Sequence, residues 1–127
     1  MVSSFGKVQA QALASIRATA GDRVTYRRGG NSATVVAVPG SSEFAIVSND
    51  QVSENIKSTD FLIRAEDLSA AMTSTGLSSF SQPERGDEIL DGSGGLFLVM
   101  PERSVPAWEW SDRDSKAWYR IHTKKAE

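Results

Sequence analysis

The chain has 127 residues, no cysteine and a formal net charge of −2 at pH 7. This length predicts a single domain with one modest core, and the lack of cysteine excludes disulfides, thiol nucleophiles and cysteine-ligated metals. Because each phosphate contact needs a cation, the acidic balance argues against a protein that grips duplex DNA.

The first residues predict an amphipathic helix over residues 4–20, which Ser4 can cap and Gly21 ends. Its apolar side chains form one stripe at helical spacing: Phe5, Val8, Ala12, Leu13 and Ile16. We expect this stripe to dock on the sheet of the same domain or, alternatively, on a neighbouring subunit. Lys7 and Arg17 argue against a secretory signal, and no stretch reaches the roughly 20 apolar residues of a membrane span. A soluble, intracellular chain is expected.

A first hairpin is predicted after this helix. Two β-rich runs, residues 22–28 and 33–38, flank the turn-forming sequence Gly29-Gly30-Asn31. The second run is expected to close at Pro39.

The middle of the chain predicts short elements separated by polar connections. In chain order they are a strand at 44–47, a polar loop or exposed hairpin tip at 48–58, a strand at 61–63 and a helical turn at 65–68. Serine, threonine and glycine then dominate residues 72–82, which indicates a surface connection anchored by Leu77 and Phe80.

A second hairpin is expected over residues 86–101, with a glycine-rich turn at 91–95 and Pro101 closing its last strand. Many short strands with frequent turns predict a mainly β fold, a small β-barrel or sandwich of hairpins with one N-terminal α-helix. The barrel is expected to span residues 21–125.

The last third of the chain predicts a terminal hairpin. Trp108 and Trp110 are two residues apart, so both rings lie on one face of an extended strand. A polar connector at 111–115 leads to a second strand with two faces, Trp118, Arg120 and His122 on one and Tyr119 and Ile121 on the other. We expect these rings to close the core.

No motif predicts catalysis. The chain has no Gly-x-Ser-x-Gly sequence, and the run at 92–95 lacks the lysine and helix of a phosphate-binding loop. His122 is the only imidazole, so a structural or interface role is expected. The acidic pairs are ordinary solvated turn residues in this interpretation: Glu66 with Asp67, Glu84 with Asp87, and Asp112 with Asp114. We expect no enzyme, no cofactor and no metal.

The C-terminal aromatic residues allow three interpretations. Core packing is the first, and a protein–protein interface, where Trp, Tyr and Arg are enriched, is the second. The third is a stacking platform for single-stranded nucleic acid, because cations surround Trp118 and Tyr119: Lys116, Arg120, Lys124 and Lys125. The acidic total argues against the third interpretation.

The order of motifs along the chain resembles a known family. The sequence runs Val24-Thr25-Tyr26-Arg27-Arg28-Gly29, then Asp60-Phe61-Leu62-Ile63 with Asp67-Leu68, then Pro83-Glu84-Arg85-Gly86-Asp87-Glu88-Ile89. It ends with Trp108-Glu109-Trp110-Ser111-Asp112 and Arg120-Ile121-His122-Thr123-Lys124. From about Gly21 to Lys125 this order resembles the head–tail joining, or head-completion, proteins of tailed bacteriophages, the class that includes lambda's joining protein.

The resemblance implies a structural virion protein, assembled in the host cytoplasm. Its β-barrel-like subunits would form a ring, commonly hexameric, between a portal or adaptor protein and a tail-terminator or tail-tube protein. The ring would close the DNA-filled head, dock the tail and surround the channel through which DNA passes. It implies no catalytic residues, no cofactor and no membrane partner.

A ring of identical subunits needs two different surfaces on each subunit. The candidates are the N-terminal stripe (Phe5, Val8, Ile16) and the terminal aromatic hairpin (Trp108, Trp110, Trp118, Tyr119). The polar segment is a candidate lumenal gate, or a contact to the next ring, through Asn49, Asp50, Gln51, Glu54, Asn55 and Lys57. The alternatives are a tail-terminator or connector-adaptor ring, or a small β-barrel that binds single-stranded nucleic acid.

Overall fold

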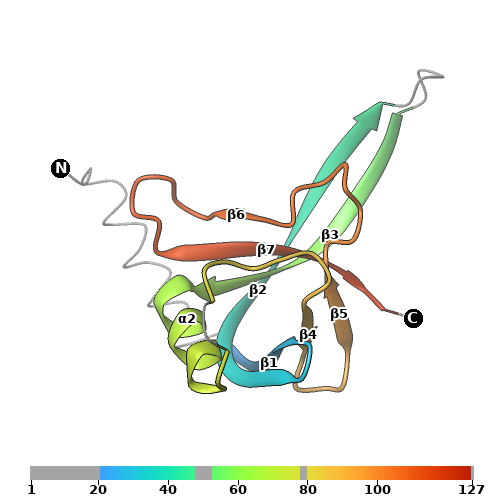
Figure 1. The fold of residues 1–127 in the computed structure, drawn as a ribbon. Helices are drawn as coiled ribbons and strands as arrows, with labels where there is room; N and C mark the ends of the chain where they lie inside the picture. Colours follow the sequence, from blue (N-terminus) through green and yellow to red (C-terminus); the bar gives the residue numbers. More distant parts are fainter. Residues whose placement is uncertain (1–20, 48–52, 78–79, 127) are drawn as a thin grey trace.

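The computed structural model describes residues 21–47, 53–77 and 80–126, and it confirms a mainly β fold (Figure 1). The strands are β1 (Asp22–Arg28), β2 (Asn31–Val47), β3 (Ser53–Arg64), β4 (Glu88–Leu90), β5 (Leu96–Val99), β6 (Trp108–Trp110) and β7 (Trp118–Lys125). The helix α2 (Ala65–Ser74) lies between β3 and β4. The N-terminal helix expected over residues 4–20 lies outside the described residues.

Six strands close into a barrel in the order β3-β2-β1-β4-β5-β7, because β7 pairs again with β3. The strand β6 is added to β7 next to the short β5 pairing. Every pairing is antiparallel. Closure pairs most strand edges, which protects a small β domain from edge-to-edge association.

The three predicted hairpins are confirmed. In the first, the two-residue turn Gly29-Gly30 joins the paired residues Arg28 and Asn31, and Gly29 has a φ of 58°. The turn between β4 and β5 contains Gly94 with a φ of 92°. In both turns glycine supplies a left-handed backbone conformation that a β-carbon would strain.

One core fills the barrel and extends under α2. Alternate strand residues point inward, as the two-residue period of a strand requires. The buried members from the strands are Val24, Tyr26, Val35, Ala37, Phe61, Ile63, Ile89, Phe97, Val99, Tyr119 and Ile121. Leu68 and Met72, one helical turn apart on α2, complete it together with Phe80, and Leu77 packs against it. The expected anchoring by Leu77 and Phe80 is therefore confirmed.

The strand β2 is longer than the sequence predicts, since it runs through Pro39 to Val47 instead of closing at the proline. Pairing with β1 ends at Ala37, so beyond that residue β2 has β3 as its only partner. A residue without an N–H group is tolerated on such an edge. At Gly40 an added β-carbon would lie 3.4 Å from Leu62 Cδ1, so glycine leaves room for that side chain.

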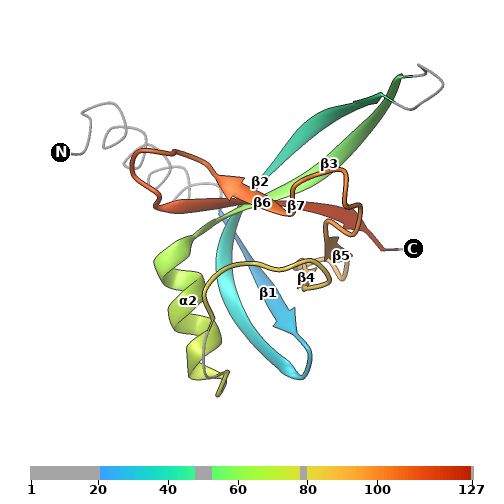
Figure 2. The same cartoon turned by 45° about the horizontal axis from the view of Figure 1, so that its top comes forward.

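The distal part of the β2–β3 hairpin projects from the barrel as a two-stranded ribbon, here called the arm (residues 42–47 and 53–58; Figures 1 and 2). Ser42 pairs with Ser58, and pairing continues to Val47 with Ser53. Of the two alternatives expected for residues 48–58, a loop or an exposed hairpin tip, residues 53–58 fit the hairpin because they are strand, while residues 48–52 lie outside the described residues. Ile56 is the one apolar residue in the sequence of 53–58, so this strand lacks the apolar alternation by which a half-buried strand is recognised.

The helix α2 is also longer than the single turn expected. Its end is marked by side chains that satisfy carbonyls of the last turn: the Ser74 hydroxyl donates to Ala71 O at 2.6 Å and the Thr75 hydroxyl to Met72 O at 2.6 Å. Gly76 follows in a left-handed conformation with a φ of 94°. Within the described residues, no helix has the length and apolar character needed to cross a membrane.

Candidate partner interface

The aromatic patch of the terminal hairpin consists of Trp108, Trp110 and Tyr119. Trp110 pairs with Tyr119 across β6 and β7, and their rings stack with centroids 4.9 Å apart and planes at 19°. Trp108 meets both rings edge to face, with centroid distances of 5.1 Å to Trp110 and 4.9 Å to Tyr119. Both tryptophans are half-buried, so each leaves part of a rigid ring at the surface.

Beside this patch the surface is hollowed. Glu109 and Arg113 line the hollow together with Trp108 and Trp110. Aromatic rings that are fixed by their own subunit and flanked by charges of both signs are typical of protein–protein contacts.

Trp118 and Tyr119 are buried within the subunit, with 2% and 4% of their surfaces exposed. Trp118 lies on the opposite face of β7 from Tyr119 and packs with Val38, Leu62 and Ala117. An isolated subunit therefore presents almost none of either ring to a partner. The same burial argues against a platform on which nucleic-acid bases stack.

The remaining predicted site residues fall into two groups. Phe5, Val8, Ile16, Asn49, Asp50 and Gln51 lie outside the described residues. Glu54, Asn55 and Lys57 lie on β3 in the arm, where Asn55 and Lys57 are exposed.

At the root of the arm a buried carboxylate joins three strands, a feature that the sequence did not reveal. Asp60 on β3 lies opposite His122 on β7, and its Oδ1 is 2.9 Å from His122 Nδ1. The hydroxyls of Ser42 and Ser58 donate to Asp60, and Arg120 Nη1 donates to its Oδ2 at 2.6 Å. Burial alone would raise the pKa of Asp60, but these hydrogen bonds outweigh it and lower that pKa to about 2.

Ser58, His122 and Asp60 are the residue types of a hydrolytic triad, but their geometry is not that of one. Ser58 Oγ and Asp60 Oδ1 both approach the same ring nitrogen, His122 Nδ1, at 3.5 and 2.9 Å, whereas a triad needs them on opposite nitrogens. His122 Nε2 has no hydrogen-bond partner among the described residues, and the nearest carboxylate oxygen, on Glu109, is 3.8 Å away. The whole imidazole is buried. The arrangement thus gives His122 a structural role.

A second buried carboxylate, Asp87, joins β1 to the start of β4. Tyr26 donates its hydroxyl to Asp87, and Arg28 binds both carboxylate oxygens, through Nε at 2.9 Å and Nη2 at 2.8 Å. The backbone N–H of Glu84 donates to Asp87 as well, at 3.0 Å. Burial and the adjacent carboxylate raise the pKa of Tyr26 far above its usual value. The prediction that Asp87 is a solvated turn residue is therefore wrong.

Asp112 is also buried, and its Oδ1 accepts the N–H of Asp114 at 2.9 Å within the β6–β7 connector. The prediction of a solvated turn residue is therefore wrong for Asp112 too. Over the described ranges there is no group of three or more histidine, aspartate or glutamate side chains placed to hold a metal ion.

Comparison with known proteins supplies the family. Residues 5–127 match the family model described as phage head-tail joining protein. A search of curated proteins gives no match. The matched region takes in every described element and all the sequence motifs on which the resemblance was based.

Proposed function

The chain belongs to the phage head–tail joining protein family, and from this premise we propose that its subunits form a ring that closes the DNA-filled head and docks the tail. Membership makes the chain a structural phage protein of the head–tail junction. The ring, the closure of the head and the identity of the neighbours are the proposed part.

The arm is the observation that carries this proposal. It extends away from the barrel (Figure 2), and none of its described side chains belongs to either hydrophobic cluster. Its root is fixed to β7 through Asp60 and Arg120. Near the root Phe44 meets the buried His122 ring edge to face, with centroids 4.9 Å apart, whereas Ala45 and Asn55 farther out are exposed. A firmly mounted projection with an exposed outer part is suited to contacts with other subunits or with the DNA channel.

The ring requires a second, different surface on each subunit. We assign it to Trp108 and Trp110, whose half-exposed rings are the ones that a neighbour can reach. The stripe Phe5, Val8 and Ile16 stays a candidate for the same contact. Partly exposed tryptophans held in a fixed orientation lose little conformational entropy on binding, which favours them as anchors.

The polar segment of residues 48–58 is proposed as the gate, either in the lumen or against the next ring. Its candidate residues are Asn49, Asp50, Gln51, Glu54, Asn55 and Lys57, of which the last three lie in the arm. This set is polar and carries charges of both signs, so it would not grip phosphates strongly as DNA passes. On the head side the ring would meet a portal or adaptor protein, and on the tail side a tail-terminator or tail-tube protein.

Trimming the arm tests the proposal. Phe44 and Ile56 are cross-strand partners, so residues 45–55 can be replaced by Asn-Gly, a two-residue turn that suits a hairpin, without removing the contact of Phe44 with His122. The variant retains both serines that bind Asp60 and is expected to unfold cooperatively like the wild type. Heads completed with it should lose DNA or fail to accept tails.

The control is Glu66→Gln, which keeps the full length of the chain and neutralises one exposed carboxylate on α2. It should complete heads normally. If the trimmed subunit also supported normal particles, the arm would have no role in joining and the proposed gate would be wrong.

A further inference from the structure

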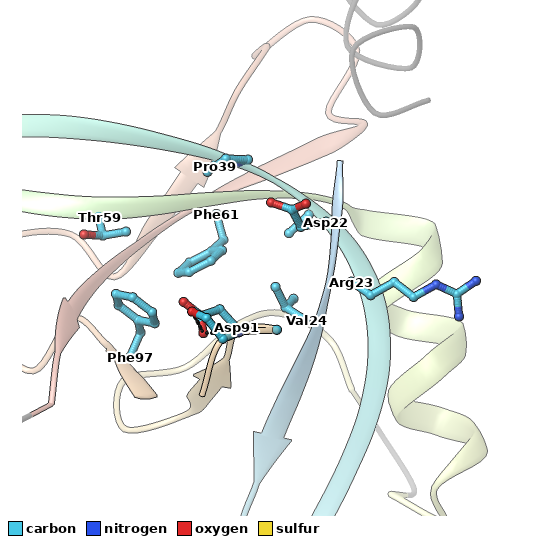
Figure 3. A pocket seen from close by; sticks show the side chains of 11 residues that line it. Asp22, Arg23, Val24, Pro39, Thr59, Phe61, Asp91 and Phe97 are labelled. Atoms are coloured by element: carbon cyan, nitrogen blue, oxygen red, sulfur yellow. Dashed lines mark hydrogen bonds between the residues drawn. The ribbon is translucent and has the colours of Figure 1, made fainter. Parts of the chain in front are cut away.

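A half-open pocket of about 550 Å³ lies at one end of the barrel (Figure 3). It is bordered by the start of β1, the β4–β5 turn, Phe97 of β5, and the parts of β2 and β3 next to the first residue of β1. The side chains that matter for its chemistry are Asp22, Val24, Phe61, Asp91 and Phe97. The proposed joining surfaces do not use this pocket.

The wall of the pocket is apolar and rigid. Phe61 and Phe97 meet edge to face, with centroids 5.1 Å apart and planes at 69°. Both rings and the Val24 side chain are buried members of the barrel core, so they cannot move aside without disturbing it. Phe61 and Phe97 are only 5% and 8% exposed, so the wall offers an apolar contact for the aliphatic stem of a long side chain and not an open ring face.

Two carboxylates stand beside this wall. Figure 3 shows Asp22 and Asp91 bordering the space in front of Phe61, while the side chain of Arg23 extends away from it. Asp91 is held in place because its Oδ1 accepts hydrogen bonds from the N–H and hydroxyl of Ser93, at 3.0 and 2.9 Å, and from Gly95 N at 2.7 Å. These three bonds converge on Oδ1, and together with the nearby charge of Lys125 they lower the pKa of Asp91, while no hydrogen bond within the described residues reaches Oδ2.

We propose that this pocket receives an arginine side chain from a neighbouring protein of the particle. The carboxylates repel anions, and the apolar wall favours an organic cation over a hydrated metal ion, which takes at least six oxygen ligands. A guanidinium can bind a carboxylate with two N–H groups while its aliphatic stem lies against an apolar wall. That the donor is a protein of the head or tail rests on the proposed function.

The binding test uses a probe of defined chemistry. N-acetyl-arginine amide is titrated into the full chain, and the NMR signals of the Phe61 and Phe97 rings are followed. We expect saturable shifts, with binding at least about tenfold weaker for the neutral isostere N-acetyl-citrulline amide. Equal binding of the two probes, or no saturable shift, would overturn the proposal.

Two variants distinguish binding in the pocket from a general effect of the protein's net charge. Asp22 is exposed and makes no ion pair with the described residues, so Asp22→Asn should fold normally and weaken the arginine probe about tenfold. Glu43→Gln removes an exposed carboxylate on the arm and should leave binding unchanged. If Asp22→Asn bound the probe as tightly as the wild type, the carboxylate would not be part of the site and the proposal would fall.

A test of particle assembly identifies the protein that supplies the arginine. Asp22→Lys should block joining, and suppressor mutations are expected to replace an arginine with an acidic residue in a head or tail protein. Suppressors within this chain would instead make a second copy the donor and contradict the assignment to a head or tail protein.

If the probe fails but the wild-type subunit still joins heads to tails, only the pocket proposal falls. If the wild-type subunit does not load onto heads, the proposed function falls independently of the probe.

Discussion

Asp60 and Asp87 each tie together strands that are far apart in the sequence. Asp60 binds groups from β2 and β7, and Asp87 binds groups from β1. A buried carboxylate is tolerated only where donors and cations compensate its lost hydration. Both carboxylates meet that condition, so each is expected to be a point of high sensitivity to substitution.

Asp60 predicts a specific loss of stability in acid. Its pKa is about 2 in the folded protein against an ordinary value of 3.8. A lowered folded-state pKa stabilises the protein above the ordinary value, and this contribution disappears as the pH falls from 3.8 to about 2. The expected loss is about 2 kcal/mol, measured as the free energy of unfolding in urea at pH 6 and near pH 2.

The control for that measurement is Asp60→Asn, which cannot titrate at this position. It should be less stable at pH 6, and its stability should fall less steeply in acid than that of the wild type. Identical slopes for the two proteins would show that Asp60 is not the group responsible.

Substitution at Asp87 should be more damaging than substitution of its hydroxyl partner. Asp87→Ala leaves Arg28 and Tyr26 without their shared acceptor, and a loss of about 3–5 kcal/mol is expected. Tyr26→Phe removes one of several donors and should cost about 1–2 kcal/mol. Glu84→Gln is the control, because the Glu84 carboxylate is mostly exposed and 3.8 Å from Arg28. If Glu84→Gln lost as much free energy of unfolding in urea as Asp87→Ala, Asp87 would not be the carboxylate on which this cluster depends.

At the scale of elements, the terminal hairpin buries Trp118 on one face and leaves Trp108 and Trp110, the proposed partner contacts, half-exposed on the other. Trp110 is half-buried, so Trp110→Ala should lose about 1–2 kcal/mol of stability and reduce tail attachment at least about tenfold. Trp118→Ala removes a buried ring on the other face and should cost about 3–5 kcal/mol. If heads loaded with Trp110→Ala accepted tails as well as wild type, Trp110 would not be a partner contact.

The sequence predicts the hairpins because their signals are local. Glycine turns such as Gly29-Gly30 and strand alternation such as that of Tyr119 and Ile121 depend on neighbours in the chain. The extent of α2 was missed because the serines and threonines of its last turn resemble a loop by composition, although Ser74 and Thr75 satisfy carbonyls there.

The contacts of Asp60 and Asp87 could not be predicted in the same way. Tyr26 and Asp87 are separated by 61 residues and Asp60 and His122 by 62, so no local pattern brings them together. Both Tyr26 and Asp87 lay in quoted motifs, but only the pairing of β1 with β4 places them in contact. Loop and hairpin tip could not be distinguished for residues 53–58 for a related reason, since Ile56 is the one apolar residue in that stretch of sequence and creates no alternating pattern.

At the scale of the whole molecule, the net charge of −2 agrees with a wall past which DNA can move. With Trp118 and Tyr119 buried, the isolated subunit should show no saturable binding to a single-stranded oligonucleotide at low salt. Fluorescence anisotropy of a labelled oligonucleotide measures this directly. Tight, salt-sensitive binding would favour the nucleic-acid barrel over the joining role.

The central claim is that this subunit completes DNA-filled heads. The most direct measurement adds the purified chain to DNA-filled heads that lack tails, determines the number of copies bound per head, and then adds tails. The account predicts binding in a fixed multiple, retention of DNA and competence for tail attachment. A subunit that ignored heads and bound preassembled tail tubes would contradict the account and indicate a tail-terminator ring.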